Sequence, residues 1–329
     1  MQAREWADNR DAASQVAEKT GRTKRLAPDS DGVEEAAVIL RQGGLVAFPT
    51  ETVYGLGADA TNSQAVARIF EAKGRPSFNP LIVHVADLEM AERIGNLPRP
   101  ALNLVGKDWP AGLSVVVPLK PDAGISELVT AGQNTVALRC PKSPIALELL
   151  RALNRPIAAP SANVSGKISP TTADHVLNGL DGRIDAVIDG GPTISGLEST
   201  IVGFANVSPQ ILREGAFVDL PEDWSRATQA TDRPVAPGQL ESHYAPKASV
   251  RLNAQTAATD EFLLGFGAVQ GDLTLSTTGD LVEAAARLYA ALHEADARGV
   301  RRLAVAPIPE TGLGRAINDR LRRAAAPRD

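Results

Sequence analysis

Residues 43–85 read GGLVAFPTETVYGLGADATNSQAVARIFEAKGRPSFNPLIVHV, and this stretch decides the fold. Residues 45–48 are apolar over the length of a strand, and a proline ends that run. A polar loop punctuated by glycines follows over 50–57. The apolar spacing after this loop predicts a helix over 63–73, with Ser63 as its N-cap.

A cationic turn, KGRP at 73–76, follows the predicted helix and leads to Asn79 and the strand-like residues 81–85. Cations and hydroxyls therefore lie in loops at the ends of buried elements, which is where α/β sheets place their ligand sites. The alternative is an ordinary packing unit without a site, because a strand–loop–helix–strand unit alone is common.

The rest of the chain alternates short strands and helices, and only residues 96–112, which contain proline and glycine, are predicted to be irregular. Helices are predicted over 33–42, 87–94, 143–153, 172–178, 280–298 and 314–325. Strands are predicted over 81–85, 113–119, 135–138, 186–189, 210–213, 248–252, 262–266 and 302–306. Many short strand pairs favour a twisted, mixed sheet over a purely parallel one, so the predicted fold class is α/β.

Composition shifts along the chain predict four regions. Residues 1–30 are polar and charged and are predicted to be a poorly ordered extension. Residues 31–215 form the predicted main domain, and 248–329 a small βα array. Residues 216–247 carry several prolines and few apolar side chains, which is typical of a linker.

The overall composition excludes several classes of protein. The net charge of −5 argues against a large nucleic-acid-binding face, which is usually basic. A single cysteine, Cys140, excludes an intramolecular disulfide and a cysteine-based zinc cluster. No apolar run approaches the roughly 20 residues of a membrane span, and the N-terminus lacks the apolar core of a signal peptide. A cytoplasmic enzyme is the simplest class that remains.

Several catalytic templates do not fit the sequence. The segment GGPTISGLEST at 190–200 imitates a phosphate-binding loop through Gly191 and Gly196, but Leu197 and Glu198 stand where that motif requires Lys and then Ser or Thr. There is no GxSxG elbow, and the four histidines are scattered without metal-ligand spacing. His84 in its apolar strand is, taken alone, more typical of a core histidine than of a ligand.

What remains is a set of cations, small hydroxyls and one amide at the ends of predicted elements. The cations are Lys73, Arg75, Arg139 and Arg213, and the small polar groups are Ser161, Asn163, Thr171, Ser199 and Thr200. Cations and backbone amides suit phosphates and carboxylates, and arginine binds both in a bidentate fork. Each arginine taken singly is more typical of a surface ion pair, and sequence alone does not show that these ends converge.

Two motifs at a fixed spacing, PTETVYGLG and KGRPxxNPLIVH, resemble the YrdC-type domain of L-threonylcarbamoyladenylate synthases. The segments LRCPKS, PSANVSG, ESTIV and ILREG resemble further segments of that family. APGQLESHYAPK at 236–247 is similar to the linker of the family's long, two-domain form, and TGLGRAINDRLRRAA at 311–325 to its C-terminal end. The resemblance covers roughly residues 31–329 and leaves the N-terminal extension outside.

The resemblance implies a twisted mixed β-sheet of the YrdC-like type, with a small Rossmann-like α/β domain at the C-terminus. It also implies an enzyme, a nucleotidyltransferase that joins L-threonine, bicarbonate or CO2, and ATP into threonylcarbamoyl-AMP and pyrophosphate, with Mg2+ accompanying ATP. The product would feed the threonylcarbamoyl modification of tRNA through a downstream transferase machinery. The substrates themselves supply the nucleophile, so such a site needs positioning and charge neutralisation.

Residue roles follow from the same resemblance. Threonine would be held by Thr52, His84, Arg139, Ser161 and Ser199, with Thr50 as an alternative to Thr52. ATP would be held by Lys73, Arg75, Asn79, Thr135, Asn163, Thr171 and Arg213, of which Lys73 and Arg75 are the catalytic candidates. Tyr244 would reach the nucleotide when the linker folds over the site as a lid. No residue is assigned to a metal.

Two other classes stay open at this point. A non-catalytic RNA-binding module is one, although the net charge and the scarcity of aromatic residues weigh against it, and direct tRNA binding is only weakly supported. A carbamoyl-transferring maturation protein that shares the YrdC-type domain is the other, although such proteins also carry zinc-finger-like domains that one cysteine excludes.

Overall fold

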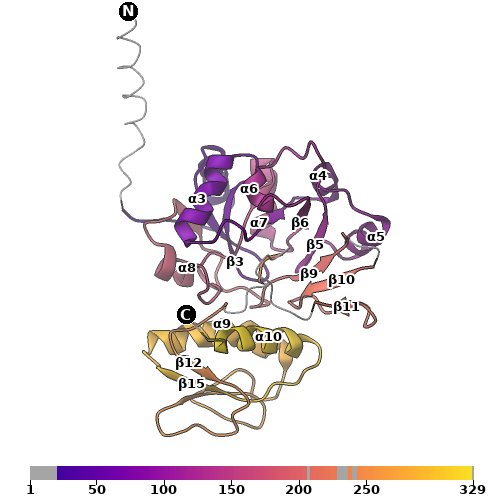
Figure 1. The fold of residues 1–329 in the computed structure, drawn as a ribbon. Coiled ribbons are helices and arrows are strands. Elements are labelled where there is room, and N and C mark those ends of the chain that lie inside the picture. Colours follow the sequence, from indigo (N-terminus) through magenta and orange to yellow (C-terminus); the bar gives the residue numbers. More distant parts are fainter. Residues whose placement is uncertain (1–20, 206–207, 228–235, 239–242, 328–329) are drawn as a thin grey trace, which may run out of the picture.

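The structure is a computed structural model that describes residues 21–205, 208–227, 236–238 and 243–327. A large α/β unit lies above a small one in Figure 1, and helices α9 and α10 of the small unit face the large unit. Among the described residues, no helix has both the length and the apolar character needed to cross a membrane.

The large unit is built on one mixed sheet of eleven strands, which confirms the predicted fold class. In spatial order its strands are β1 (Lys24–Leu26), β8 (Ala186–Ile188), β2 (Val46–Pro49), β3 (Tyr54–Asp59), β7 (Ile157–Ala158), β4 (Ile82–His84), β6 (Thr135–Arg139), β5 (Leu113–Pro118), β9 (Thr200–Gly203), β10 (Gln210–Arg213) and β11 (Ser225–Arg226). The pair β4–β6 is parallel, whereas β2–β3 and β5–β6 are antiparallel.

Helices cover both faces of this sheet. Successive strand residues point to opposite sides, and the apolar side chains on each side pack against helices. Its helices are α2 (Ser30–Arg41), α3 (Ser63–Lys73), α4 (Leu88–Ile94), α5 (Arg99–Asp108), α6 (Glu127–Thr130), α7 (Pro144–Leu153) and α8 (Ala173–Leu180). Helices α3, α4, α5 and α8 contribute to the main core, and α2 and α7 to a second core that also contains Phe48 and Ile157.

The site lies where α2 and α7 leave a sheet face uncovered. Ile82, Val116, Ala137 and Ile201, from four neighbouring strands, form a small apolar cluster there with Ala236 of the predicted linker. Because His84 and Arg139 lie two residues after Ile82 and Ala137, they point to the same face at the ends of β4 and β6. The fold thus places polar side chains at the rim of an apolar floor.

The small unit is a four-stranded parallel sheet with two helices; three of its strands and both helices are predicted from the sequence, and β14 is not. Its strands, in spatial order, are β12 (Ser249–Arg251), β15 (Arg302–Val305), β13 (Phe262–Gly265) and β14 (Leu273–Thr274), and its helices are α9 (Leu281–Ala297) and α10 (Leu313–Ala325). Its core includes Leu288, Tyr289 and Ile317 from the helices and reaches Val53 and Ile168 of the large unit. The two units therefore share buried apolar contacts.

Part of the expected loop over 50–57 is wrong, because β3 begins at Tyr54 and pairs with β2. One of the glycines that suggested a loop, Gly57, is instead needed for close packing. A Cβ atom on Gly57 would lie 2.8 Å from the ring of Phe48, and Gly55 faces Phe48 in the ladder. Only glycine allows the two strands to approach around this ring.

Three further expectations are corrected. The N-cap of α3 is Asn62, not Ser63, since its side chain accepts hydrogen bonds from the two amides that follow Ser63. Residues 96–112 contain the helix α5, whose first turn tolerates a proline and whose Ala101 and Val105 are buried four residues apart. The expected disorder of residues 1–30 is wrong for 21–30, which include β1 and the start of α2; residues 1–20 lie outside the described part.

The predicted domain boundaries stay predictions, and so does the division between linker and domain. The first part of the expected linker over 216–247 adds strand β11 to the large sheet, beside β10. Residues 228–235 and 239–242 of this linker lie outside the described residues.

Candidate active site

A pocket opens at the end of the apolar floor, between the large sheet and the linker. Its walls include these residues predicted for the site: Arg75, His84, Arg139, Ser161, Ser199, Arg213 and Tyr244. They come from segments far apart in the chain, and the parallel register of β4 and β6 sets His84 directly beside Arg139. The structure therefore brings together the strand ends that sequence alone left separate.

One end of the pocket is built around Arg139, which lies in a buried ion pair. Its Nη2 donates to Glu51 Oε1 at 2.7 Å and to Thr52 Oγ1 at 2.9 Å. Thr52 Oγ1 in turn lies 2.8 Å from Thr50 Oγ1. Thr50 borders the pocket, whereas Thr52 is fully buried behind it, so the geometry puts Thr50 nearer to a ligand.

His84 at this end is a neutral imidazole. Burial, together with the neighbouring charge of Arg139, lowers its pKa to about 3. Its ring meets Phe48 edge-on at 5.9 Å, and its Nδ1 has no hydrogen-bond partner among the described residues. A buried nitrogen of this kind at a pocket wall is open to a ligand group.

Three buried cations lie at the other end: Arg75 and Arg213 line the pocket, and Lys73 lies behind Ser161 of its wall. Lys73 Nζ donates to the carbonyls of Ser161 and Asn163. The two arginines also donate mostly to backbone carbonyls. Arg75 Nη2 donates to Pro80 O at 2.8 Å, and Arg213 Nη2 donates to Ser199 O at 2.8 Å and to Ser199 Oγ at 3.1 Å. In the described part of the chain none of the three forms a salt bridge.

Burial without a carboxylate partner weakens the charged form of these groups. It lowers the pKa of Lys73 well below its usual value, that of Arg75 to about 10, and that of Arg213 also downward. Burying such cations without a counter-charge is costly, so an anionic ligand bound at Arg75 and Arg213 would lower that cost.

Two buried amides add unsatisfied polar groups at this end. Neither side-chain atom of Asn79 has a partner among the described residues, although the residue is fully buried. Asn163 donates to the carbonyls of Val164 and Lys167, and its own Oδ1 is left without a described partner. Buried polar groups are normally hydrogen-bonded, so these atoms mark places for ligand groups.

Six predicted residues do not border the pocket: Thr52, Lys73, Asn79, Thr135, Asn163 and Thr171. Two of these have other surroundings. Thr135 lies four residues before Arg139 on β6 and lines a separate hollow beside Phe78 and Gln210. Thr171 lies 3.2 Å from Nδ1 of His175 through its hydroxyl. Their assignment to ATP stays a prediction.

The linker closes the pocket with Gly238, His243 and Tyr244. Gly238 has a positive φ of 84°, and a Cβ atom there would lie 2.7 Å from Tyr244 Oη and 2.9 Å from Arg213 Cδ. Tyr244 is itself a left-handed non-glycine residue with φ 61°, and it is almost fully buried. The segment is thus fitted tightly to the pocket wall.

Sequence reasoning missed Glu51, Glu198, His243 and Gly238 as wall or support residues. The Pro-Gly pair at 237–238 is a turn signal that could have indicated Gly238. The two glutamates could not be found this way, because a single acidic residue in a polar segment carries no pattern until its partners are known.

Comparison with known proteins gives consistent matches. Residues 38–215 match the family model described as telomere recombination, and 200–326 match the C-terminal domain of threonylcarbamoyl-AMP synthase. The chain is 41% identical to the threonylcarbamoyl-AMP synthase of Bacillus subtilis, over 93% of this chain and 96% of that one. It is 40% identical to that of Pyrococcus abyssi, over 88% and 93%. The crystal structure of P. abyssi Sua5 complexed with L-threonine superposes with a TM-score of 0.84 at 36% identity, covering 92% of this chain and 97% of that one.

A mixed α/β sheet whose pocket joins a paired arginine to a wall of buried cations defines an enzyme of the nucleotidyltransferase type. The chain belongs to the threonylcarbamoyl-AMP synthase family, in its long form with a C-terminal domain. The enzyme interpretation is thereby favoured over the RNA-binding module.

Proposed function

We propose that the pocket joins L-threonine, bicarbonate or CO2, and ATP into threonylcarbamoyl-AMP and pyrophosphate. The observation that carries this proposal is the group of three buried cations, Lys73, Arg75 and Arg213, which have no carboxylate partner in the described residues. Such a group suits a triphosphate, because cations around the phosphates stabilise a phosphoryl group during transfer.

Threonine fits the opposite end as a zwitterion. Its carboxylate would meet the Arg139 guanidinium, and its hydroxyl the small polar groups around Thr50, Thr52, Ser161 and Ser199. The unpartnered Nδ1 of His84 adds one more contact for the amino acid. In support, the P. abyssi relative has been crystallised with L-threonine.

The reaction needs no covalent residue of the protein. The ammonium group of threonine first loses a proton to solvent; the neutral amine then attacks CO2 and releases a second proton to solvent as the carbamate forms. A carbamate oxygen then attacks the α-phosphorus of ATP, and the bond between the α- and β-phosphates breaks as pyrophosphate leaves. Lys73, Arg75 and Arg213 would bind the charge that shifts to the leaving group, and Asn79, Thr135, Asn163, Thr171 and Tyr244 complete the proposed nucleotide contacts.

Mg2+ would enter with ATP rather than reside on the protein. In the described ranges no group of three or more His, Cys, Asp and Glu side chains could hold a metal ion. Mg2+ commonly binds substrate phosphates with few protein ligands, so this donor set is compatible with a nucleotide-borne ion. The ion would neutralise phosphate charge next to the cations already named.

The proposal also places the protein upstream of a tRNA threonylcarbamoyl transferase machinery, in the cytoplasm. The product is a mixed anhydride that reacts with water, and a pocket closed by the linker would protect it. Direct tRNA binding is not needed for this step.

The test is pyrophosphate release by the purified protein, with threonine, ATP, bicarbonate and Mg2+ each omitted in turn. We expect release only when all four are present. Release at the full rate without threonine would contradict the proposal and indicate simple ATP hydrolysis. Heat-inactivated protein and an EDTA-treated sample serve as controls.

A further inference from the structure

Glu198 is a buried carboxylate in a wall that the proposed function fills with anions. It borders the pocket beside Ser199, and only 6% of its surface is exposed. An ionised carboxylate at such a place would repel the phosphates of ATP, because charges interact strongly where water is excluded. Its negative charge therefore has to be balanced by other residues.

The cation that pairs directly with Glu198 comes from the small unit, and Arg213 of the large unit adds a second positive charge nearby. Arg320 lies in α10 and is the largest fully buried side chain among the described residues, with 1% of its surface exposed. Its Nε donates to Glu198 Oε2 at 2.8 Å. Its Nη1 donates to the carbonyl of Glu214 at 2.8 Å and to Asp319 at 2.7 Å.

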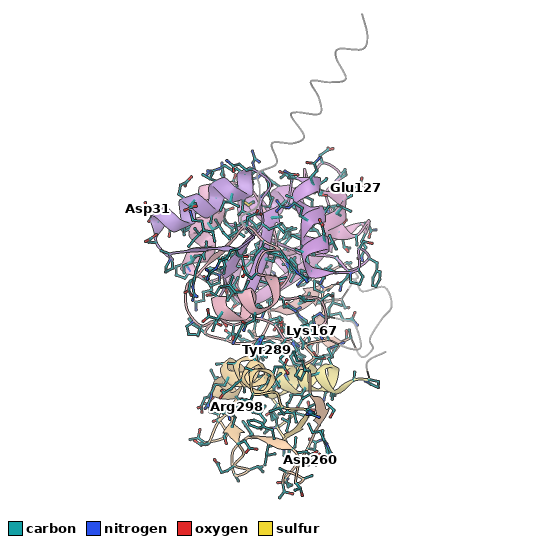
Figure 2. The ribbon with its side chains drawn as sticks, turned by 90° about the vertical axis from the view of Figure 1, so that its left-hand side faces the viewer. Asp31, Glu127, Lys167, Asp260, Tyr289 and Arg298 are labelled. Atoms are coloured by element: carbon teal, nitrogen blue, oxygen red, sulfur yellow. The ribbon has the colours of Figure 1, made fainter. Side chains whose placement is uncertain are left out.

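Two hydroxyls complete the surroundings of this carboxylate. Tyr289 Oη, from α9, donates to Glu198 at 2.9 Å, and Ser169 Oγ donates to it at 2.5 Å. Figure 2 shows Tyr289 at the junction of the two units, on the side of the small one that faces the large one. Glu198 is thus the point of the pocket wall to which both helices of the small unit are attached.

Arg320 also supports the linker. Its guanidinium carbon lies 5.2 Å from the centre of the Tyr244 ring, and the backbone N–H of His243 donates to the carbonyl of Arg323, one turn further along α10. The same helix therefore holds the Glu198 carboxylate and the linker residues that close the pocket.

We propose that Arg320 is a positioning residue for the reaction: it neutralises Glu198, so that the pocket wall accepts the phosphates of ATP. The small unit thereby completes the nucleotide end of a pocket that the large unit carries. This inference rests on the proposed function, since it assumes that ATP is the anion bound there.

The experiment compares ATP and threonine binding, by calorimetry without turnover, in the full chain and three variants. Arg320→Met removes the positive charge, Glu198→Gln removes the negative charge, and the double variant removes both. We expect Arg320→Met to weaken ATP binding by tenfold to hundredfold. Threonine binding should change by less than about threefold, because the amino acid carries no net charge. In the double variant ATP affinity should return to within about threefold of wild type.

Arg322→Gln is the matched control, since Arg322 lies on the same helix, is well exposed and pairs with Glu310 at the surface. It should leave both affinities unchanged. A folded Arg320→Met protein that binds ATP as wild type does would overturn the inference, and so would an equal loss of threonine and ATP binding.

The double variant decides the matter if Arg320→Met alone does not fold. Near-wild-type ATP affinity in the double variant supports charge compensation, and a tenfold loss contradicts it. If the wild-type chain itself binds no ATP, the proposed function fails first, which separates the two results.

Discussion

The cations at the two ends of the pocket have different partners. At the threonine end, Arg139 is held by the carboxylate of Glu51 and the hydroxyl of Thr52. At the nucleotide end, Lys73 and Arg75 donate to backbone carbonyls and pair with no carboxylate among the described residues. A balanced arginine–glutamate pair suits a zwitterion, whereas unbalanced cations suit a polyanion. The pairing of the cations at each end thus indicates the net charge of the ligand that is proposed to bind there.

The largest effect is expected at the threonine end. Arg139→Met leaves Glu51 with only 10% of its side chain exposed and no arginine partner. Breaking a buried pair from one side costs about 3–5 kcal/mol, so urea unfolding should show a loss of that size. The double variant Arg139→Met/Glu51→Gln should regain most of the stability but still show a KM for threonine raised by about tenfold or more. Equal stability of the single variant and wild type would contradict the balanced-pair interpretation.

At the nucleotide end the pattern should reverse. Lys73→Met and Arg75→Ala should each lower kcat/KM by about 10²-fold or more, because phosphate neutralisation is lost. Their melting temperatures should stay equal or rise, since each substitution removes a buried cation without a carboxylate partner. Arg93→Ala is the control, because Arg93 is exposed and pairs with Glu89 on the surface of α4. Normal turnover of either variant would show that the substituted residue has no role in the site.

Acid should destabilise both ends through buried neutral histidines. Burial lowers the pKa of His84 and of His243 to about 3, against about 6.5 in an unfolded chain. The unfolded state then binds more protons between these values, so stability is full above pH 6.5 and falls as pH drops toward 3. At pH 5 the expected loss is about 2 kcal/mol for each histidine. Urea unfolding at pH 7 and pH 5 measures this loss in the free energy of unfolding. His243→Gln should remove the part that His243 contributes. A free energy of unfolding that is the same at both pH values would contradict the assigned burial.

The smallest effect is expected for the linker, which we predict to act as a lid. Tyr244 is 1% exposed, so chymotrypsin can cleave after it only when the segment opens. ATP with threonine should slow this cleavage, and Tyr244→Ala should lower activity by about tenfold through the lost aromatic contacts without unfolding either domain. A linker that is packed permanently would instead show unchanged cleavage and a fully active variant.

The sequence allowed more of the fold than of the site to be predicted. The long helix α9 and the strands β5 and β6 were predictable because their apolar patterns are regular, whereas β3 was hidden by glycines, of which Gly57 serves packing against Phe48. Candidate site cations such as Arg75, which borders the pocket, are predicted through motif resemblance. Glu51, Glu198 and Arg320 were not, since each acquires its meaning from a partner far along the chain, and long-range pairs leave no local pattern.

The most direct test of the account is mass spectrometry of the nucleotide product made from 13C-labelled bicarbonate, ATP and threonine. The account predicts threonylcarbamoyl-AMP one mass unit heavier than the unlabelled product, formed in equal amount to pyrophosphate and absent in Arg75→Ala. Threonyl-AMP without the labelled carbon, or AMP and pyrophosphate formed at the same rate without threonine, would contradict it.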